Sequence, residues 1–189
     1  MNNSELTKIL ESNFQNVDRD TLDTIFKNSS FVKIDKGTEL ITEGKRHHYF
    51  YLMLKGGVKS YYLKDSKQVC TWFAFENEII GTTSSIKGLA SKETIELLED
   101  SELVRFQSEK INELTQTNLS ISNLMSDIWS DHAIFLEERL YQLQFMDSDE
   151  KYKALILQNP EILQRVSLTD IASFLGVSRE TLSRIRAKK

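Results

Sequence analysis

Apolar residues along the chain follow a helical spacing near both ends and a strand spacing between them. Residues 4–28 form two apolar groups with helical spacing, and Asp18 stands where it can cap the second helix. From residue 31 to 106 the period shortens to two, and turns such as Gly56-Gly57 separate the runs. The predicted strands are residues 31–34, 39–41, 49–54, 58–62 and 69–73. Short strands at this spacing predict an antiparallel sandwich or roll.

A long helix is predicted from about residue 108 to 146. Its apolar residues recur every seven positions, which is typical of a helix that pairs with another helix. The residues of this repeat, which we expect at a dimer interface, are Leu114, Ile121, Met125, Ile128, His132 and Phe135. A second apolar stripe contains Trp129, Leu136, Leu140 and Leu143. With one surface for its own domain and one for a partner, the helix favours a parallel homodimer, and the alternative is that both stripes pack within one subunit.

Two short helices joined by a tight turn are predicted over residues 167–189. Thr169 can cap the first helix, and Gly176 can adopt the left-handed conformation that ends it. Ser178 can cap the second helix through its hydroxyl. The positions that face inward are Ile171, Ala172, Leu175, Leu182 and Ile185. This is the helix-turn-helix pattern, in which the second helix enters the major groove of DNA.

The distribution of charge favours DNA binding over ordinary helix packing. Residues 179–189 contain five basic residues and one acidic residue, a net charge of +4, in a chain whose net charge is −4. Two amphipathic helices with a glycine between them also occur in helical proteins that bind no DNA. Positive charge gathered on one helix, however, suits contact with phosphates.

Composition limits the other classes of function. The chain has 189 residues, 40% of them hydrophobic, which is ample for a packed core, and no apolar run approaches the ~20 residues that span a bilayer. The start of the sequence lacks the features of a signal peptide, so we expect a cytoplasmic protein without membrane contact. Cys70 has no partner for a disulfide or a CxxC site. Three histidines, two of them adjacent, do not form a metal-binding set, so we expect no metal, no cofactor and no enzyme.

A roll, a long helix and a C-terminal helix-turn-helix, in this order, resemble the Crp/Fnr family of bacterial transcription regulators. Residues 36–44 and 49–59 look like the opening strands and glycine turns of its cyclic-nucleotide-binding roll. Residues 178–185, S-R-E-T-L-S-R-I, look like its recognition helix. The resemblance implies an α+β fold with an N-terminal antiparallel β-roll of the jelly-roll type and flanking helices. We expect residues 1–146 to form this effector domain with the dimerisation helix, and residues 147–189 to form a small all-α DNA-binding domain.

The recognition helix carries the more specific part of the resemblance. In the catabolite activator branch of the family an Arg, a Glu and a second Arg contact base edges, and they match Arg179, Glu180 and Arg184. This agrees with their chemistry, because arginine bonds guanine bidentately and glutamate accepts from cytosine. We expect Ser178, Thr181 and Lys188 to contact phosphates, and Ser183 also faces outward. The family's β-hairpin wing is not seen after this helix, so we expect fewer contacts with the DNA backbone.

The sensing half departs from the family pattern. Members that bind cyclic AMP place a glutamate for the ribose and an arginine for the phosphate after a glycine turn, which Gly81 retains here. The glutamate position falls on or near Thr82 and the arginine position near Lys92, which lacks the planar fork that clamps phosphate. Glu93 would repel an anion. With Thr83 and Thr94 these residues form the predicted effector pocket, which we expect to bind no cyclic AMP but to accept an unknown small molecule.

The sequence therefore predicts a homodimeric, sequence-specific transcription regulator. Its expected partners are double-stranded DNA, a second copy of the chain, RNA polymerase and a small-molecule effector. The alternative is a small-molecule-binding or protein-interaction module that has lost DNA binding.

Overall fold

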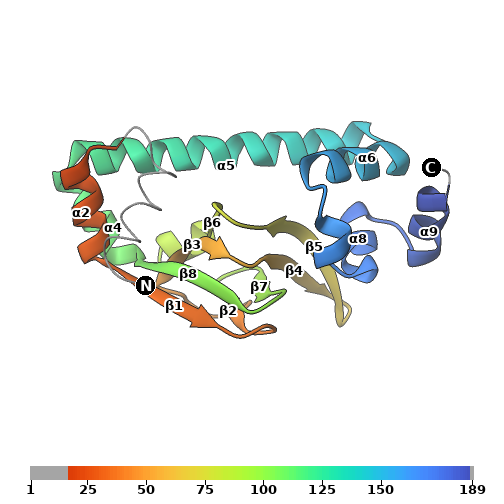
Figure 1. The fold of residues 1–189 in the computed structure, drawn as a ribbon, viewed down its shortest axis with the longest axis horizontal. Coiled ribbons are helices and arrows are strands. Elements are labelled where there is room, and N and C mark those ends of the chain that lie inside the picture. Colours follow the sequence, from red (N-terminus) through yellow and green to blue (C-terminus); the bar gives the residue numbers. More distant parts are fainter. Residues whose placement is uncertain (1–16, 188–189) are drawn as a thin grey trace.

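Two antiparallel four-stranded sheets form the roll in the computed structural model, which describes residues 17–187 (Figure 1). One sheet has the strand order β1-β8-β3-β6 and the other the order β2-β7-β4-β5. The first sheet contains β1 (Ser29–Ile34), β8 (Ser101–Gln107), β3 (Tyr49–Lys55) and β6 (Ile79–Ile80). The second contains β2 (Glu39–Ile41), β7 (Thr94–Leu97), β4 (Val58–Lys64) and β5 (Lys67–Ala74). The predicted roll is confirmed.

The two sheets enclose an apolar core. Its side chains come from the inward-facing positions of strands in both sheets, as the two-residue period predicts. Met53 and Leu103 from one sheet and Val58 and Ile95 from the other are fully buried. Because burial of such a side chain is worth about 1.5–3 kcal/mol, this core fixes how the two sheets face each other.

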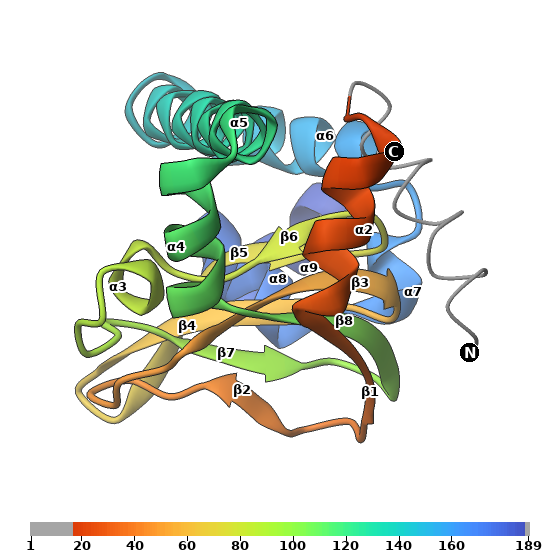
Figure 2. The same ribbon diagram turned by 90° about the vertical axis from the view of Figure 1, so that its left-hand side faces the viewer.

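Helices close one end of the roll. Figure 2 shows α2 (Arg19–Lys27) and α4 (Ser108–Thr117) rising from the sheets toward α5 (Leu119–Phe145). Leu22 of α2 and Phe50 of β3 belong to the same buried cluster as Ile121 of α5. Asp18 caps α2 as predicted, since its Oδ1 accepts from the Thr21 N–H at 2.9 Å. The helix predicted before it, at residues 4–16, lies outside the described residues.

The long helix predicted from residue 108 to 146 is divided at Asn118. Asn118 has an extended backbone, with φ −128° and ψ 109°, and ends α4 while it caps α5. Its side-chain oxygen accepts from the Ile121 N–H at 3.1 Å, which asparagine does readily at a helix start. The prediction of one continuous helix was wrong because the seven-residue repeat runs across this break. The second helix, α5, extends along the whole roll (Figure 1).

Four short helices follow α5 and pack around a buried cluster that also includes Cys70 of β5. They are α6 (Ser148–Gln158), α7 (Ile162–Arg165), α8 (Leu168–Leu175) and α9 (Arg179–Ala187). Gly176 ends α8 with a left-handed φ of 72°, as predicted. The cap of α8 is Ser167 and not Thr169, because the Ser167 hydroxyl accepts from the Asp170 N–H at 3.1 Å. The helix therefore begins two residues earlier than its apolar spacing indicated.

This helical group is docked on the second sheet of the roll, with α8 beside β5 (Figure 1). Cys70 of β5 is 3% exposed and lies in the same buried cluster as the helices. Its N–H donates to the Ser173 hydroxyl of α8 at 2.9 Å. Burial raises the pKa of the Cys70 thiol to about 12. The cysteine is therefore a packed strand residue, as predicted.

Arg165 of α7 clamps the helical group to the roll. Its guanidinium donates to Glu76 at 2.8 Å, to Glu99 at 2.5 Å and to the Gly56 carbonyl at 2.9 Å. It also lies 4.5 Å from the centre of the Phe75 ring. The hydrogen bonds from Arg165 lower the pKa of Glu76 to about 2. Several charge-assisted bonds at one residue hold the two parts of the chain in a defined arrangement.

Candidate DNA-binding helix and ligand cavity

One face of α9 is buried and the other is open to solvent. Leu182 and Ile185 are 1% and 7% exposed and pack into the core of the helical group, as predicted. Ser178 caps the helix, because its hydroxyl accepts from the Thr181 N–H at 3.1 Å. The amphipathic spacing of the sequence thus orients the helix and leaves its basic side outward.

The residues predicted to contact DNA lie on the outward side of α9. Those that are exposed are Ser178, Arg179, Glu180, Ser183 and Arg184. Thr181 is half-buried and accepts from Arg184 at 3.3 Å. The pKa of Glu180 is lowered by its own backbone N–H and by the Ser178 hydroxyl, so its carboxylate is a hydrogen-bond acceptor at neutral pH. Lys188 lies outside the described residues.

Four of the six predicted dimer residues pack against the subunit's own domain, while two are exposed. Ile121 and Met125 of α5 are buried in the cluster that joins the helices to the roll, and Leu114 and Ile128 pack against that cluster. The other two predicted residues, His132 and Phe135, line a cavity beneath α5. The second apolar stripe is the outward one, since Leu136, Leu140 and Leu143 are 52%, 55% and 53% exposed.

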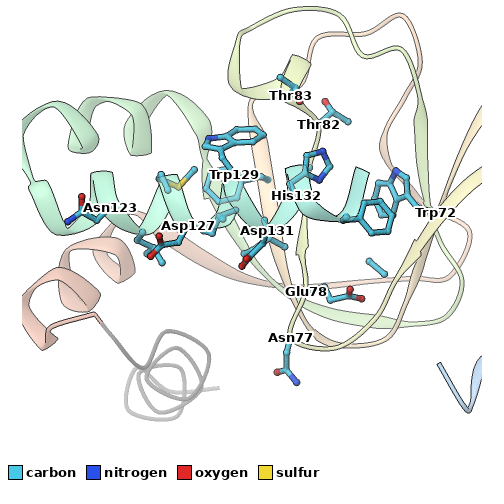
Figure 3. A pocket seen from close by; sticks show the side chains of 18 of the residues that line it. Trp72, Asn77, Glu78, Thr82, Thr83, Asn123, Asp127, Trp129, Asp131 and His132 are labelled. Atoms are coloured by element: carbon cyan, nitrogen blue, oxygen red, sulfur yellow. The ribbon is translucent and has the colours of Figure 1, made fainter. Parts of the chain in front are cut away.

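The cavity lies between the inward face of α5 and the roll (Figure 3). Its volume is about 670 Å³. Aromatic side chains form much of its wall, and Figure 3 shows Trp72 of β5 on one side with Trp129 and His132 of α5 on the other. The remaining aromatic lining residues are Phe50, Phe73 and Phe135. The centres of the His132 and Phe135 rings are 6.3 Å apart.

The ionisable groups around the cavity are mostly acidic. Glu78, Asp127 and Asp131 lie on the side away from Thr82 and Thr83 (Figure 3). Glu78 is exposed to solvent, but partial desolvation by its surroundings raises its pKa, and the charge of nearby Glu76 adds to this effect. Among the described residues that line the cavity, none is a lysine or an arginine.

Comparisons with known proteins agree with this architecture. Residues 31–118 match the family model of the cyclic nucleotide-binding domain. FixK2 from Bradyrhizobium japonicum is 18% identical with a TM-score of 0.76, over 85% of this chain and 83% of FixK2. A protein from Eubacterium rectale, described as a transcriptional regulator of the Crp/Fnr family, is 17% identical with a TM-score of 0.72, over 91% of this chain and 83% of its own. The chain has the Crp/Fnr fold.

A third solved structure of this fold is the c-di-GMP-responsive global regulator CLP from Xanthomonas campestris. It is 20% identical with a TM-score of 0.63, over 90% of this chain and 91% of CLP. No curated protein sequence matches the chain. The resemblance drawn from the sequence is thus confirmed for the fold, with the roll, the long helix and the C-terminal helices in the expected order. Within residues 17–187 no helix is long and apolar enough to cross a membrane.

The segment that binds phosphate in cyclic-AMP-binding members of the Crp/Fnr family is divided between two places here. Gly81, Thr82 and Thr83 line the cavity. A Cβ at Gly81 would lie 2.9 Å from the Cβ of Phe50, so a side chain there would displace the neighbouring strand. The Thr82 hydroxyl accepts from the Ser85 N–H at 3.0 Å and so caps α3 (Thr83–Ile86). These three predicted residues are therefore brought together.

The other three predicted pocket residues lie apart from the cavity lining. Lys92 is exposed and does not line the cavity. Thr94 is buried in β7, and its hydroxyl accepts from the Glu43 N–H at 3.0 Å. The carboxylate of Glu93 bonds the Ser60 hydroxyl and accepts from Trp72 Nε1 at 3.1 Å. A fixed carboxylate thus stands beside the position where the resemblance places the phosphate clamp.

Several cavity residues were missed from the sequence. Trp72 and Phe73 were recognised as strand residues but not as lining residues. Asp127, Asp131 and Trp129 come from α5. Asp127, Asp131 and Phe135 are four residues apart and Trp129 is three residues before His132, so the helical spacing could have identified them, had this face been known to turn toward the roll.

Proposed function

We propose that this protein is a homodimeric transcription regulator that reads DNA with α9 and does not respond to cyclic AMP. The observation that carries the proposal is the outward face of α9, where two arginines and an ionised glutamate are exposed beside a capped helix start. The Crp/Fnr fold supports it, because it places this helix at the end of a chain that also contains a long helix able to pair.

The side chains of α9 can be divided into those that contact bases and those that contact phosphates. Arg179 and Arg184 can each bond the O6 and N7 atoms of a guanine, and Glu180 can accept from the amino group of a cytosine. Ser178, Thr181 and Ser183 have hydroxyls near the helix start, where phosphate oxygens are favoured. We assign Lys188 to phosphate contact as well, on the basis of its charge.

The outward stripe of α5 supports the homodimer. One row of this stripe repeats every seven residues and consists of Ser122, Trp129, Leu136 and Leu143. A second row stands four residues after the first three of these and consists of Ser126, Ala133 and Leu140. We call this set the outward seam. Its small residues near the start of α5 let two backbones approach, and its leucines toward the end supply apolar contact. Two copies joined along this seam would place their α9 helices on the same side, as a reader of two half-sites requires.

Selection from a pool of random double-stranded DNA tests the proposal. We expect the purified protein to enrich a palindromic site with half-sites about 34 Å apart, which is one turn of DNA. Arg179→Ala and Arg184→Ala should each weaken binding to that site by about 1–3 kcal/mol. Lys153→Ala, at an exposed residue of α6, is the control and should bind as the unchanged protein does.

If a folded dimer enriches no site at moderate salt, the proposal fails. The protein would then be better described as a ligand-binding or protein-interaction module.

Calorimetry with cyclic AMP tests the second half of the proposal, which is that the protein does not respond to cyclic AMP. We expect no heat of binding, because Lys92 is exposed and the carboxylate of Glu93 is fixed by Ser60 and Trp72.

A further inference from the structure

We propose that the cavity beneath α5 binds a planar aromatic molecule that carries no negative charge. The inference extends the proposed function by naming a class of ligand, and ligand binding can be measured without DNA. It is carried by three features of the cavity, which are its aromatic walls, the sign of its charges and its position relative to the outward seam.

The walls of the cavity suit a flat ring. Trp72 and Phe73 come from β5, Trp129 and Phe135 from α5, and Phe50 from β3. Aromatic rings from two facing elements can stack on a planar ligand or meet it edge-on, and each such contact is worth about 0.5–1.5 kcal/mol beyond area burial. A volume of about 670 Å³ falls in the range of about 300–1,000 Å³ that is typical of small-molecule sites. The cavity thus has room for at least two fused rings.

The charges of the cavity disfavour an anion. Glu78, Asp127 and Asp131 line it, and within its described lining no lysine or arginine balances them. A fourth carboxylate, that of Glu93, accepts a hydrogen bond from the indole N–H of Trp72. The carboxylates of Glu78, Asp127 and Asp131 are exposed, so water weakens their repulsion of a negatively charged ligand, but no positive charge in the described lining offsets it. A neutral molecule avoids this repulsion, and a cation would gain from the carboxylates and from the ring faces.

The cavity remains available when two copies pair. Its α5 residues include His132 and Phe135, which face the roll, whereas Leu136, Leu140 and Leu143 of the outward seam face away from it. Trp129 lies at the border, since it lines the cavity and also belongs to the seam. A partner helix on the seam would therefore cover the outer edge of Trp129 and leave the interior of the cavity free.

Calorimetry with three bicyclic probes of similar shape and different charge tests the proposal. The probes are the cation N-methylquinolinium, the neutral molecule quinoline and the anion quinoline-2-carboxylate, each at pH 7.5. We expect the cation and the neutral molecule to bind, and the anion to bind at least about tenfold more weakly, which corresponds to about 1.4 kcal/mol. Equal or tighter binding of the anion would overturn the proposal, and so would a failure of all three to bind at millimolar concentration.

Two sets of variants establish where the probes bind. Thr83→Trp places a large side chain at an exposed position on the rim and should abolish binding, while Lys87→Trp, just beyond α3 and away from the lining, should not. The double variant Asp127→Asn with Asp131→Asn should strengthen binding of the anion by about tenfold relative to the unchanged protein. If Thr83→Trp binds the probes normally, the site lies elsewhere and the proposal fails. Loss of DNA binding in the selection experiment would leave these results unaffected.

Discussion

The carboxylate of Glu93 is fixed by two hydrogen-bond donors on neighbouring strands. It bonds the Ser60 hydroxyl and accepts from the Trp72 indole at 3.1 Å, so its charge is held inside the roll by two donors. Ser60 is fully buried, which makes these bonds costly to lose. The sequence suggested the repulsion but not the partners, because Ser60 and Trp72 are 33 and 21 residues away along the chain.

Replacing Glu93 should destabilise the roll without creating a cyclic AMP site. We expect Glu93→Ala to lower the free energy of unfolding by about 1–3 kcal/mol, since a buried hydroxyl and an indole N–H lose their charged acceptor. Urea unfolding measures this, with Lys92→Ala as the neighbouring exposed control, for which we expect a change within about 0.5 kcal/mol. An unchanged midpoint for Glu93→Ala would mean that these hydrogen bonds contribute little in solution.

At the scale of elements, α5 divides its apolar residues between two tasks. Ile121 and Met125 anchor it to the roll, and Leu136, Leu140 and Leu143 remain exposed. The seven-residue repeat predicted both stripes, but periodicity gives only the angle between stripes and not which of them meets the roll. That choice depends on α2, α4 and the roll, whose long-range contacts with α5 no local pattern encodes.

A charge on the outward seam should separate the dimer. We expect Leu140→Lys to give monomers in analytical ultracentrifugation, because a lysine pair would face each other across two parallel helices. Ile134→Lys is the matched control: Ile134 is 58% exposed on the same helix but lies off the seam, so the dimer should persist. Dissociation by both variants, or by neither, would argue against this seam.

The parts of the fold that neighbouring residues determine were predicted, and the parts that distant contacts determine were not. Helix caps at Asp18 and Ser178 and the left-handed Gly176 were predicted, because a few neighbouring residues determine them. The break at Asn118 was missed, since a repeat that continues through a break conceals it. The cavity was only partly predicted because Gly81, Thr82 and Thr83 belong to a recognisable segment, whereas its aromatic walls come from strands and a helix brought together by the fold.

For the whole molecule, β5 is the element that contacts both the cavity and the C-terminal helical group. Trp72 and Phe73 line the cavity, and the Phe73 ring lies 5.4 Å from that of Phe174 in α8. The turn after β5 carries Glu76, which Arg165 holds, and is followed by the lining residues Asn77 and Glu78. A shift of this strand or turn would therefore change both the cavity lining and the contact with the C-terminal helices.

Removing the Arg165 clamp should loosen the contact between the two parts, and Cys70 can report it. Cys70 is 3% exposed beneath α8, and burial raises its thiol pKa, so it should react slowly with an aromatic disulfide reagent. Arg165→Ala removes hydrogen bonds to two carboxylates, each worth about 1.5–3 kcal/mol. We expect the thiol to react at least about tenfold faster, because each 1.4 kcal/mol lost from docking raises the open population tenfold.

The matched control is Lys153→Ala, an exposed position on α6 away from the clamp, which should leave the rate unchanged. Circular dichroism should show the same helix and strand content in Arg165→Ala, since the helical group keeps its own buried cluster of Tyr152, Ile171 and Leu182. A fast-reacting thiol in a folded variant would show that docking, and not global unfolding, protects Cys70. If the rate does not rise, the apolar contact between α8 and β5 holds the helical group on the roll without Arg165, and β5 rather than the clamp would connect the cavity to α9.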